Sequence, residues 1–509
     1  MSASYETLTN HLRELAALKS TLGLLGWDQE TMMPPRAAAS RADELSLLSR
    51  MAHERAMADE LGDLLSACEQ DTALTVDPVI GANLREIRLD YERARKLPPE
   101  LVAEFSQTTS HALEAWKGAR EVSDFATFQP WLEKILDLCR RKADCFGYPA
   151  EGEAYDALID EFEPGMTASA VEATFHPLRE ALVPLIDEIG SRAAPDDGPA
   201  HVEVPIEVQQ AFNREILEQL GFDLKAGRLD VSTHPFSSGV APGDTRITSR
   251  YTPAGLAEAL SSTMHEAGHG MYEQGLPKSE HWGQPLSEPL GLGIHESQSR
   301  LWENQVGRSR EFWRWLEPRL AVATGNAFAA YDAEALYRAA NIVRPNLIRV
   351  ESDEATYNLH VMLRFDLERA MLKGDLAPAD LPGAWNDRIK SDLGLDVPDA
   401  ARGCLQDIHW SMGAVGYFPT YTLGTLYSAQ FWDAILVELP GLPGAIGRGE
   451  FSGLLGWLRE NIHRRGRQLP AASLCLELTG KPLDHGPFMD YLSDKLGDIY
   501  GLAGSPKAH

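Results

Sequence analysis

Apolar residues recur at three- and four-residue spacing along most of the chain. Three stretches show the spacing over several turns: residues 5–27, 99–120 and 207–222. Positions at this spacing lie on one face of an α-helix and are typical of a helix packed against a core. The pattern predicts a mainly α protein. Neither a heptad run nor a fixed-period repeat is present, which argues against a coiled coil or a solenoid.

Two segments interrupt the helical pattern. Residues 227–253, GRLDVSTHPFSSGVAPGDTRITSRYTP, combine β-branched and turn residues, and they predict a short β-hairpin or small sheet. Residues 191–205, SRAAPDDGPAHVEVP, form the longest polar break and predict a loop or a weak subdomain boundary near 190–205. We otherwise expect residues 1–509 to form a single unit.

Composition narrows the class of protein. A chain of 509 residues that is 44% hydrophobic can bury a large core, and its net charge of −28 repels nucleic acid and anionic membranes. No apolar stretch approaches a membrane-spanning length, and Glu6, Arg13 and Glu14 interrupt the start where a signal peptide needs an apolar run. We therefore expect a cytoplasmic protein. Five cysteines without a CxxC pair argue against a disulfide framework or a thiolate zinc site.

Residues 261–275, SSTMHEAGHGMYEQG, have the periodicity of a helix. Thr252 and Pro253 suit the N-cap and the first helical position, so we expect a helix from about Pro253 to Gln274. Its apolar stripe comprises Leu256, Leu260, Met264, Ala267 and Met271.

Two histidines on this helix indicate a metal site. His265 and His269 are four residues apart, so both imidazoles can reach one ion, while Glu266 projects about 100° around the axis and can act as a base. The alternative is a pair of polar core histidines. Gly268 and Gly270 each cost about 0.8–1 kcal/mol relative to Ala inside a helix, which indicates close packing or a substrate nearby.

A third ligand must come from outside this motif, because no HxxGxxH continuation follows. Downstream carboxylates are Glu273, Glu280, Glu288, Glu296 and Glu303. We choose Glu296, because it follows a helix start after Gly293 in GLGIHESQSRLWENQ. We expect His295 to support the site or contact substrate, since a fourth ligand would close the catalytic position.

Further motifs accompany HEAGH, and none would be specific alone: GWDQETMMP (26–34), HPF (234–236), DTRIT (244–248), HESQ (295–298), IRVESDE (348–354), LQDIHW (405–410) and GYFPTYTLG (416–424). Together they resemble the M32 family of metallocarboxypeptidases, the carboxypeptidase Taq type, over essentially the whole chain. One departure is Ser352, which replaces the alanine of the family pattern IRxxAD.

The resemblance implies a helical, saddle-like fold with a deep groove, often a homodimer, that releases single residues from peptide C-termini with broad specificity. It implies that His265, His269 and Glu296 bind Zn²⁺, for which Co²⁺ can substitute, and that Glu266 is the general base.

The same resemblance assigns substrate contacts. Arg349 would bind the terminal carboxylate, and His409 with Tyr417 or Tyr421 would line the oxyanion side. The choice between the tyrosines stays open. An Arg fork matches a carboxylate, and a neutral His or a phenol can donate to an oxyanion.

Each assignment has a structural alternative. Arg349 could pair with Glu351 or Asp353, and His409, Tyr417 and Tyr421 could be packed core residues. For HPF and DTRIT the structural interpretation is as good as the functional one, because Asp244 and Arg246 could brace a loop.

Two other functions remain open. An endo-acting zinc oligopeptidase shares the metal chemistry but does not need a free C-terminal carboxylate. A non-catalytic helical peptide-binding protein with a structural metal belongs to a different class. Glu266 argues against it, because a structural zinc site needs no unligated carboxylate beside an open position.

Overall fold

The computed structural model describes residues 2–502, and its N-terminal part consists of helices. Their bounds are α1 Ala3–Thr31, α2 Ala38–Ala56, α3 Asp59–Glu69, α4 Thr72–Thr75, α5 Pro78–Lys96, α6 Pro99–Glu121, α7 Phe125–Phe146, α8 Ala154–Ile159, α9 Ala168–Gly190 and α10 Ile206–Leu220. The three periodic stretches fall in α1, α6 and α10, so these predicted helices are confirmed.

A small sheet follows α10. Its strands are β1 Gly227–Val231, β2 Ser237–Ala241 and β3 Asp244–Ser249. The strand order is β1-β3-β2, with β1 parallel and β2 antiparallel to β3. The predicted hairpin is therefore β2–β3, and β1 adds a third strand.

The remaining chain is again helical. Its helices are α11 Leu256–Gly275, α12 Lys278–His281, α13 Leu292–Arg300, α14 Arg310–Ala323, α15 Ala333–Ala340, α16 Tyr357–Lys373, α17 Leu381–Leu393, α18 Pro419–Glu438, α19 Leu442–Ile446, α20 Ser452–Asn461, α21 Ala471–Thr479 and α22 Gly486–Tyr500. Short 3₁₀ turns are η1 Pro35–Ala37, η2 Gly198–His201, η3 Pro285–Ser287, η5 Arg349–Glu351, η6 Pro378–Asp380, η7 His409–Met412 and η8 His463–Gln468. The π-helical turn η4, Leu301–Val306, continues α13.

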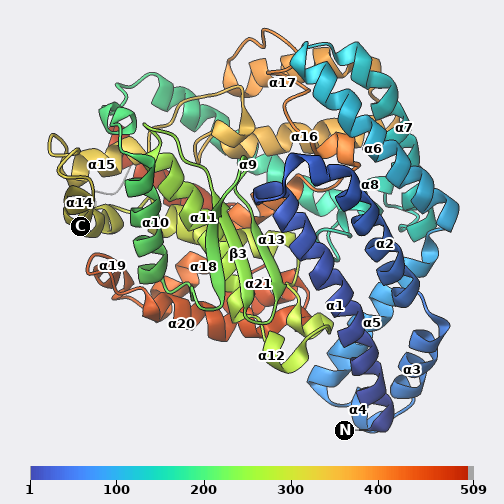
Figure 1. Ribbon diagram of the computed structural model, residues 1–509. Coiled ribbons are helices and arrows are strands. Elements are labelled where there is room, and N and C mark those ends of the chain that lie inside the picture. Colours follow the sequence, from blue (N-terminus) through green and yellow to red (C-terminus); the bar gives the residue numbers. More distant parts are fainter. Residues whose placement is uncertain (1, 503–509) are drawn as a thin grey trace.

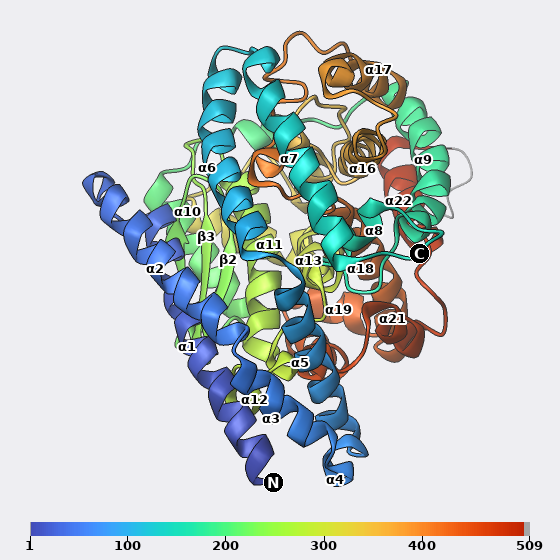
Figure 2. The ribbon, with the colours of Figure 1, turned by 90° about the vertical axis from the view of Figure 1, so that its right-hand side faces the viewer.

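Successive layers place α11 and α13 at the centre of the molecule. In Figure 1 the strands lie in front of α11, and the side view in Figure 2 shows α11, α13 and α18 in sequence behind the sheet. The predicted apolar stripe of α11 is buried along its whole length. Because α11 is covered on both sides, side chains on its α13 face are held in a largely buried environment.

The N-terminal helices have a hydrophobic core of their own. It is formed by α1, α3, α4 and α5 through Tyr5, Leu8, Leu12, Leu61, Leu65, Cys68, Leu74, Leu84, Ile87 and Tyr91. A second, much larger core holds the rest of the chain. Residues 191–205 connect α9 to α10, and a weak boundary there stays a prediction.

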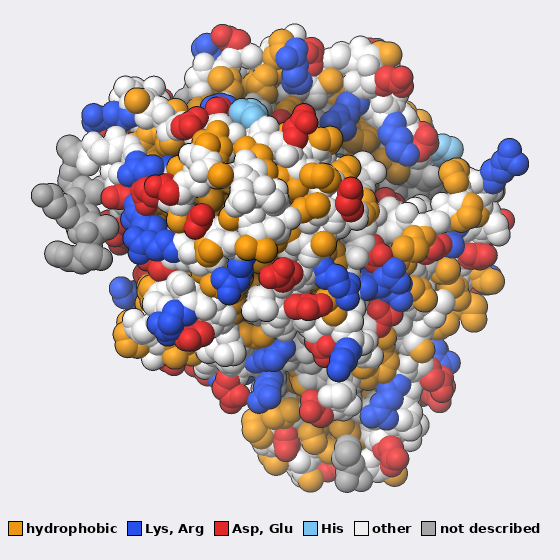
Figure 3. Space-filling model, turned by 60° about the vertical axis from the view of Figure 1, so that its left-hand side comes forward, with side chains coloured by type: hydrophobic (Ala, Val, Ile, Leu, Met, Phe, Trp, Pro, Cys, Tyr) orange, Lys and Arg blue, Asp and Glu red, His pale blue; other side chains and the backbone are white. Residues whose placement is uncertain are grey.

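The surface carries charges of both signs. On the face in Figure 3, acidic and basic side chains alternate with exposed apolar ones, and no extended basic patch gathers. Among residues 2–502, no helix has the length and apolar character needed to cross a membrane. All five cysteines are free thiols.

Candidate active site

Helix α11 begins three residues later than the sequence predicts. Its N-cap is Gly255 and its first residue is Leu256, so the assignment of Thr252 and Pro253 to the helix start is wrong. The carbonyl of Pro253 accepts from Val204 N, and the carbonyl of Thr252 accepts from Gly255 N, 3.0 Å away. Contacts with a distant segment therefore hold residues 252–253 in a turn before the helix.

The two glycines inside α11 allow close packing. A Cβ at Gly268 would lie 2.4 Å from the carbonyl oxygen of Gln298 on α13, and one at Gly270 would lie 2.7 Å from the ring of Phe222. Of the two interpretations offered by the sequence, close packing accounts for both positions. Gly268 in particular lets α13 approach the histidine face of α11.

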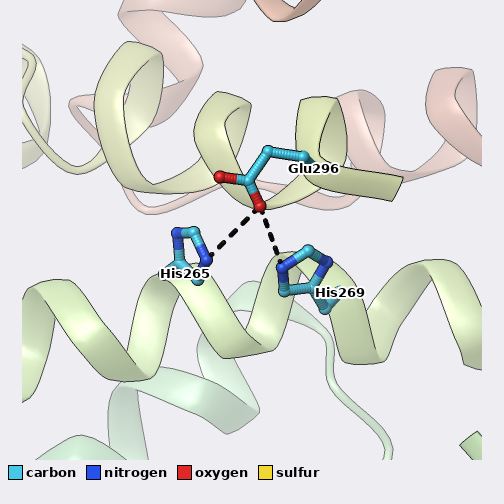
Figure 4. A group of neighbouring side chains, drawn as sticks. All are labelled: His265, His269 and Glu296. Atoms are coloured by element: carbon cyan, nitrogen blue, oxygen red, sulfur yellow. Dashed lines mark ion pairs between the residues drawn. The ribbon is translucent and has the colours of Figure 1, made fainter. Parts of the chain in front are cut away.

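Three side chains from α11 and α13 converge (Figure 4). Glu296 Oε2 lies 3.3 Å from His269 Nε2 and 3.7 Å from His265 Nε2. One ligand atom from each residue lies within 4.8 Å of the other two, and within residues 2–502 they form the one such group of side chains that could hold a metal ion. Two imidazole nitrogens and a carboxylate oxygen in this arrangement fit a divalent transition metal such as zinc.

The other nitrogen of each histidine is already occupied. His265 Nδ1 is 2.9 Å from Glu303 Oε2, and His269 Nδ1 is 2.5 Å from His295 Nδ1. His295 Nε2 in turn lies 2.9 Å from Glu273 Oε1. Such contacts fix the ring orientation and leave each Nε2 free to face an ion. His295 thus contacts the side of His269 away from Nε2, and its role as a supporting or substrate-contacting residue stays a prediction.

Carboxylates dominate the electrostatics of this part of the site. Burial raises the pKa of Glu266, which is 6% exposed, to about 7. For Glu296, burial acts in the same direction but Arg300 and His265 outweigh it, so its pKa falls well below the usual range. Arg300 Nε donates to Glu296 Oε1 at 2.7 Å, which leaves Oε2 directed at the histidines. We call His265, Glu266, His269 and Glu296 the metal side.

Arg349 lies in a buried ion cluster opposite these residues. Its Nε and Nη2 donate to Asp407 Oδ1 at 3.1 and 2.8 Å, and its Nη1 donates to Tyr357 Oη at 2.8 Å. Arg364 Nε donates to the other oxygen of Asp407 at 2.6 Å. Two guanidinium groups therefore share one carboxylate. The structural alternative, in which Arg349 pairs with Glu351 or Asp353, is wrong, because its ion-pair partner is Asp407.

His409 and the two tyrosines adjoin Arg349. His409 Nε2 lies 3.2 Å from Tyr421 Oη, and the Tyr421 ring centroid is 5.0 Å from the Arg349 guanidinium carbon. Burial and the positive charge of Arg349 lower the pKa of His409 to about 3, so its imidazole is neutral. Tyr417 packs between His409 and Phe162. We call Arg349, Asp407, His409 and Tyr421 the arginine side.

Tyr357 joins the two sides. Its hydroxyl accepts from Arg349, and its ring centroid lies 4.3 Å from the guanidinium carbon of Arg300, which holds Glu296. The metal side and the arginine side thus form one continuous site.

The HPF, DTRIT and GWDQ motifs meet at a different place. Asp244 and Arg246 form a bidentate pair at 2.8 Å, and the Arg246 guanidinium carbon lies 4.4 Å from the ring centroid of Trp27 on α1. Thr248 Oγ1 accepts from Phe236 N at 2.9 Å. These contacts brace the sheet against α1 and match the structural interpretation.

Sequence reasoning missed several residues that orient the site. The sequence indicates Glu303 only as an alternative ligand, yet it contacts His265. The sequence does not indicate Arg300, which contacts Glu296. Asp407 is the acidic residue of the LQDIHW motif, and the motif alone assigns it no role. The sequence feature that could have identified Asp407 is its position two residues before His409.

Comparisons with known proteins agree with this geometry. The family model described as "Carboxypeptidase Taq (M32) metallopeptidase" matches residues 7–496. The chain is 42% identical to "Thermostable carboxypeptidase 1" of Thermus thermophilus, covering 98% of this chain and 99% of the relative. It is 34% identical to "Carboxypeptidase 1" of Bacillus subtilis, covering 96% and 97%.

A solved M32 carboxypeptidase from Deinococcus radiodurans R1 superposes with a TM-score of 0.95 at 41% identity, covering 98% of this chain and 100% of that one. A solved metallocarboxypeptidase 1 of Trypanosoma cruzi superposes at 0.92 with 33% identity, covering 98% and 99%. The predicted fold class, mainly α with a small sheet, is confirmed. The chain belongs to the carboxypeptidase Taq (M32) family of metallopeptidases.

Proposed function

We propose that the protein is a zinc-dependent carboxypeptidase that releases single residues, with broad specificity, from the C-termini of peptides. The observation that carries this proposal is that a cluster of two histidines and one glutamate lies near two buried arginines, Arg349 and Arg364, which share a single carboxylate. The first fits a hydrolytic metal and the second fits a substrate carboxylate.

His265, His269 and Glu296 would hold the ion. Their ligand atoms are two imidazole nitrogens and a carboxylate oxygen, a set of the kind zinc prefers, and Co²⁺ suits the same geometry. When bound, such an ion supplies Lewis-acid activation of water and of the peptide carbonyl.

Glu266 would act as the general base. Its carboxylate lies one position from His265, is buried, and has a pKa raised to about 7 by burial, which suits proton transfer near neutral pH. It would accept the proton of the attacking water and pass it to the nitrogen of the departing amino acid. His409 and Tyr421, with Tyr417 beside them, would donate to the developing oxyanion.

Arg349 would bind the terminal carboxylate. Three of its N–H groups donate to Asp407 and Tyr357, and a guanidinium has five, so two remain for a ligand. Because Arg349 and Arg364 share only Asp407, the cluster carries one positive charge that an anion can balance.

The test is a matched pair of peptides that differ only in a free or amidated C-terminus, followed by mass spectrometry. A charge-assisted hydrogen bond contributes about 1.5–3 kcal/mol, so we expect amidation to lower kcat/KM by about 10²-fold. Free acids should shorten one residue at a time. Internal cleavage of both peptides at similar rates would instead identify an oligopeptidase.

The family resemblance also leads us to propose a homodimer that works in the cytoplasm. Light scattering on purified protein and fractionation of cells of the source organism test these two points separately from the chemistry.

A further inference from the structure

One short segment, residues 154–165, contacts residues that flank the two sides of the site. It comprises α8 and the turn that follows it. At its start Tyr155 Oη donates to Glu368 Oε2 at 2.8 Å. At its end the Phe162 carbonyl accepts from Leu292 N at 2.9 Å, and Glu163 Oε2 accepts from Gly293 N at 2.7 Å. The segment therefore spans from the arginine side to the start of α13.

Glu368 on α16 collects hydrogen bonds from three separate elements. Besides Tyr155, it accepts from Trp410 Nε1 at 2.8 Å and from Gly416 N at 3.1 Å. Trp410 directly follows His409, and Gly416 directly precedes Tyr417. One fully buried carboxylate thus fixes both residues that neighbour the proposed oxyanion donors.

Glu163 occupies the corresponding position on the metal side. It is 1% exposed, and its second oxygen, Oε1, has no hydrogen-bond partner within residues 2–502. Its Oε2 holds the first turn of α13, the helix that presents Glu296 one turn later. A negative charge at a helix N-terminus is favourable, and here it acts on a helix of nine residues.

Among the described residues 2–502, neither carboxylate forms an ion pair. Burial raises the pKa of Glu163 and of Glu368 to about 7 each, although hydrogen bonds partly oppose this. Burying a carboxylate without a paired cation costs stability, and hydrogen bonds offset only part of that cost. Their contacts with the site account for their presence better than a contribution to the core does.

We propose that Glu163 and Glu368 are positioning residues with separate tasks, joined by residues 154–165. Glu163 holds α13 so that Glu296 faces the histidines, and Glu368 holds the segment that carries His409 and Tyr417. This assignment rests on the proposed function for the role of the arginine side. The role of Glu163 in metal binding does not depend on it.

The test compares two near-isosteric variants, each of which should change one measured quantity and leave the other nearly unchanged. Glu163→Gln should lower zinc affinity by about 10-fold, measured by competition with a chromophoric chelator, while kcat and KM of the zinc-saturated enzyme change less. Glu368→Gln should leave zinc affinity unchanged and lower kcat/KM for a free-acid peptide by about 10-fold, mainly through kcat, because the donors act in the transition state.

Two further variants guard against misfolding. Glu163→Asp keeps the charge but withdraws the acceptor from Gly293, so it too should weaken zinc binding. Tyr155→Phe removes one donor from Glu368 and should lower kcat in the same direction by a smaller factor. The matched control is Asp392→Asn on α17, a buried carboxylate paired with Arg179 and Arg388 away from the site, which should change neither quantity.

If the Glu163 and Glu368 variants lowered zinc affinity and kcat together, or changed neither, the separate tasks would be wrong. A wild-type protein that binds zinc but hydrolyses no peptide would overturn the proposed function alone. The zinc-affinity comparison of Glu163→Gln with wild type would then still decide the role of Glu163.

Discussion

The metal side and the arginine side of the site have opposite charge. On the metal side two buried carboxylates, Glu266 and Glu296, accompany two histidines, and the carboxylate of Glu303 lies against His265. On the arginine side two buried guanidinium groups share one carboxylate, and burial together with Arg349 lowers the pKa of Arg364 to about 10. One side is therefore prepared for a cation and the other for an anion.

The two sides also differ in how they are built. The metal side comes from α11 and α13, whose contact is set by Gly268. The arginine side gathers η5, α16 and η7 with the start of α18, and its main ion pair joins residues 58 positions apart. In the proposed function, the arginine side would hold the terminal carboxylate of a peptide while its last peptide bond lies at the metal side. The spacing between the two sides would then select which bond is cleaved.

The largest effect should come from Glu266→Gln. Loss of a general base typically lowers kcat by about 10²–10⁴-fold, while the amide keeps the size of the side chain. Zinc content, measured by mass spectrometry, should stay at wild-type level. Glu258→Gln, an exposed carboxylate on the same helix, is the control and should be unaffected. Near-normal kcat with bound zinc would show that Glu266 is not the base.

Next in size is the loss of zinc in Glu296→Ala. Removal of one of three ligands should weaken binding by well over the roughly 10–100-fold effect of a supporting residue, for which Glu303→Gln is the comparison. Equilibrium dialysis against a chelator measures both. If Glu296→Ala kept full occupancy after dialysis, the ligand would have to be a different carboxylate.

Arg349→Ala should act on the other side without touching the metal. We expect kcat/KM for free-acid peptides to fall about 10²-fold and the acid-to-amide ratio to approach one, with zinc content unchanged. Arg344→Ala, an exposed arginine paired with Asp197, is the control. An unchanged acid-to-amide ratio would return Arg349 to a purely structural role in the Asp407 cluster.

The smallest effect concerns pH and stability. Because burial raises the pKa of Glu163 from 4.5 to about 7, the folded protein holds this proton longer than the unfolded chain does. Its contribution to stability therefore falls as pH rises from about 4.5 to 7 and stays low above that. The amide in Glu163→Gln does not titrate, so the variant does not lose this stability. The Tm of the variant minus the Tm of wild type should therefore increase between pH 5 and pH 8, by on the order of 2 °C. If this Tm difference, measured on the metal-free proteins, stayed constant between pH 5 and pH 8, the expectation would be wrong.

The part of the metal side that lies on α11 could be predicted from sequence because its geometry is local. Spacing of four on a helix places His265 and His269 together whatever the rest of the fold does. The start of α11 could not, because residues 252–253 are held by a segment near residue 204. The partners of Arg349 could not either, since Asp407 is distant in sequence and Glu351 and Asp353 were nearer acids. The helical spacing of apolar residues was enough to predict the helices. The partners of the buried charged residues depend on tertiary contacts that the spacing does not show.

The separate core of the N-terminal helices has a consequence for motion. Polar contacts join these N-terminal helices to the remainder of the protein. Among them, Asn83 Nδ2 donates to Gln284 Oε1 at 2.8 Å, and the Arg246 guanidinium lies over the ring of Trp27. Regions with few apolar contacts to their surroundings open at lower free energy than the global core. Backbone amides of α3 to α5 should therefore exchange with deuterium faster than those of α11 and α18, while the histidine cluster stays closed.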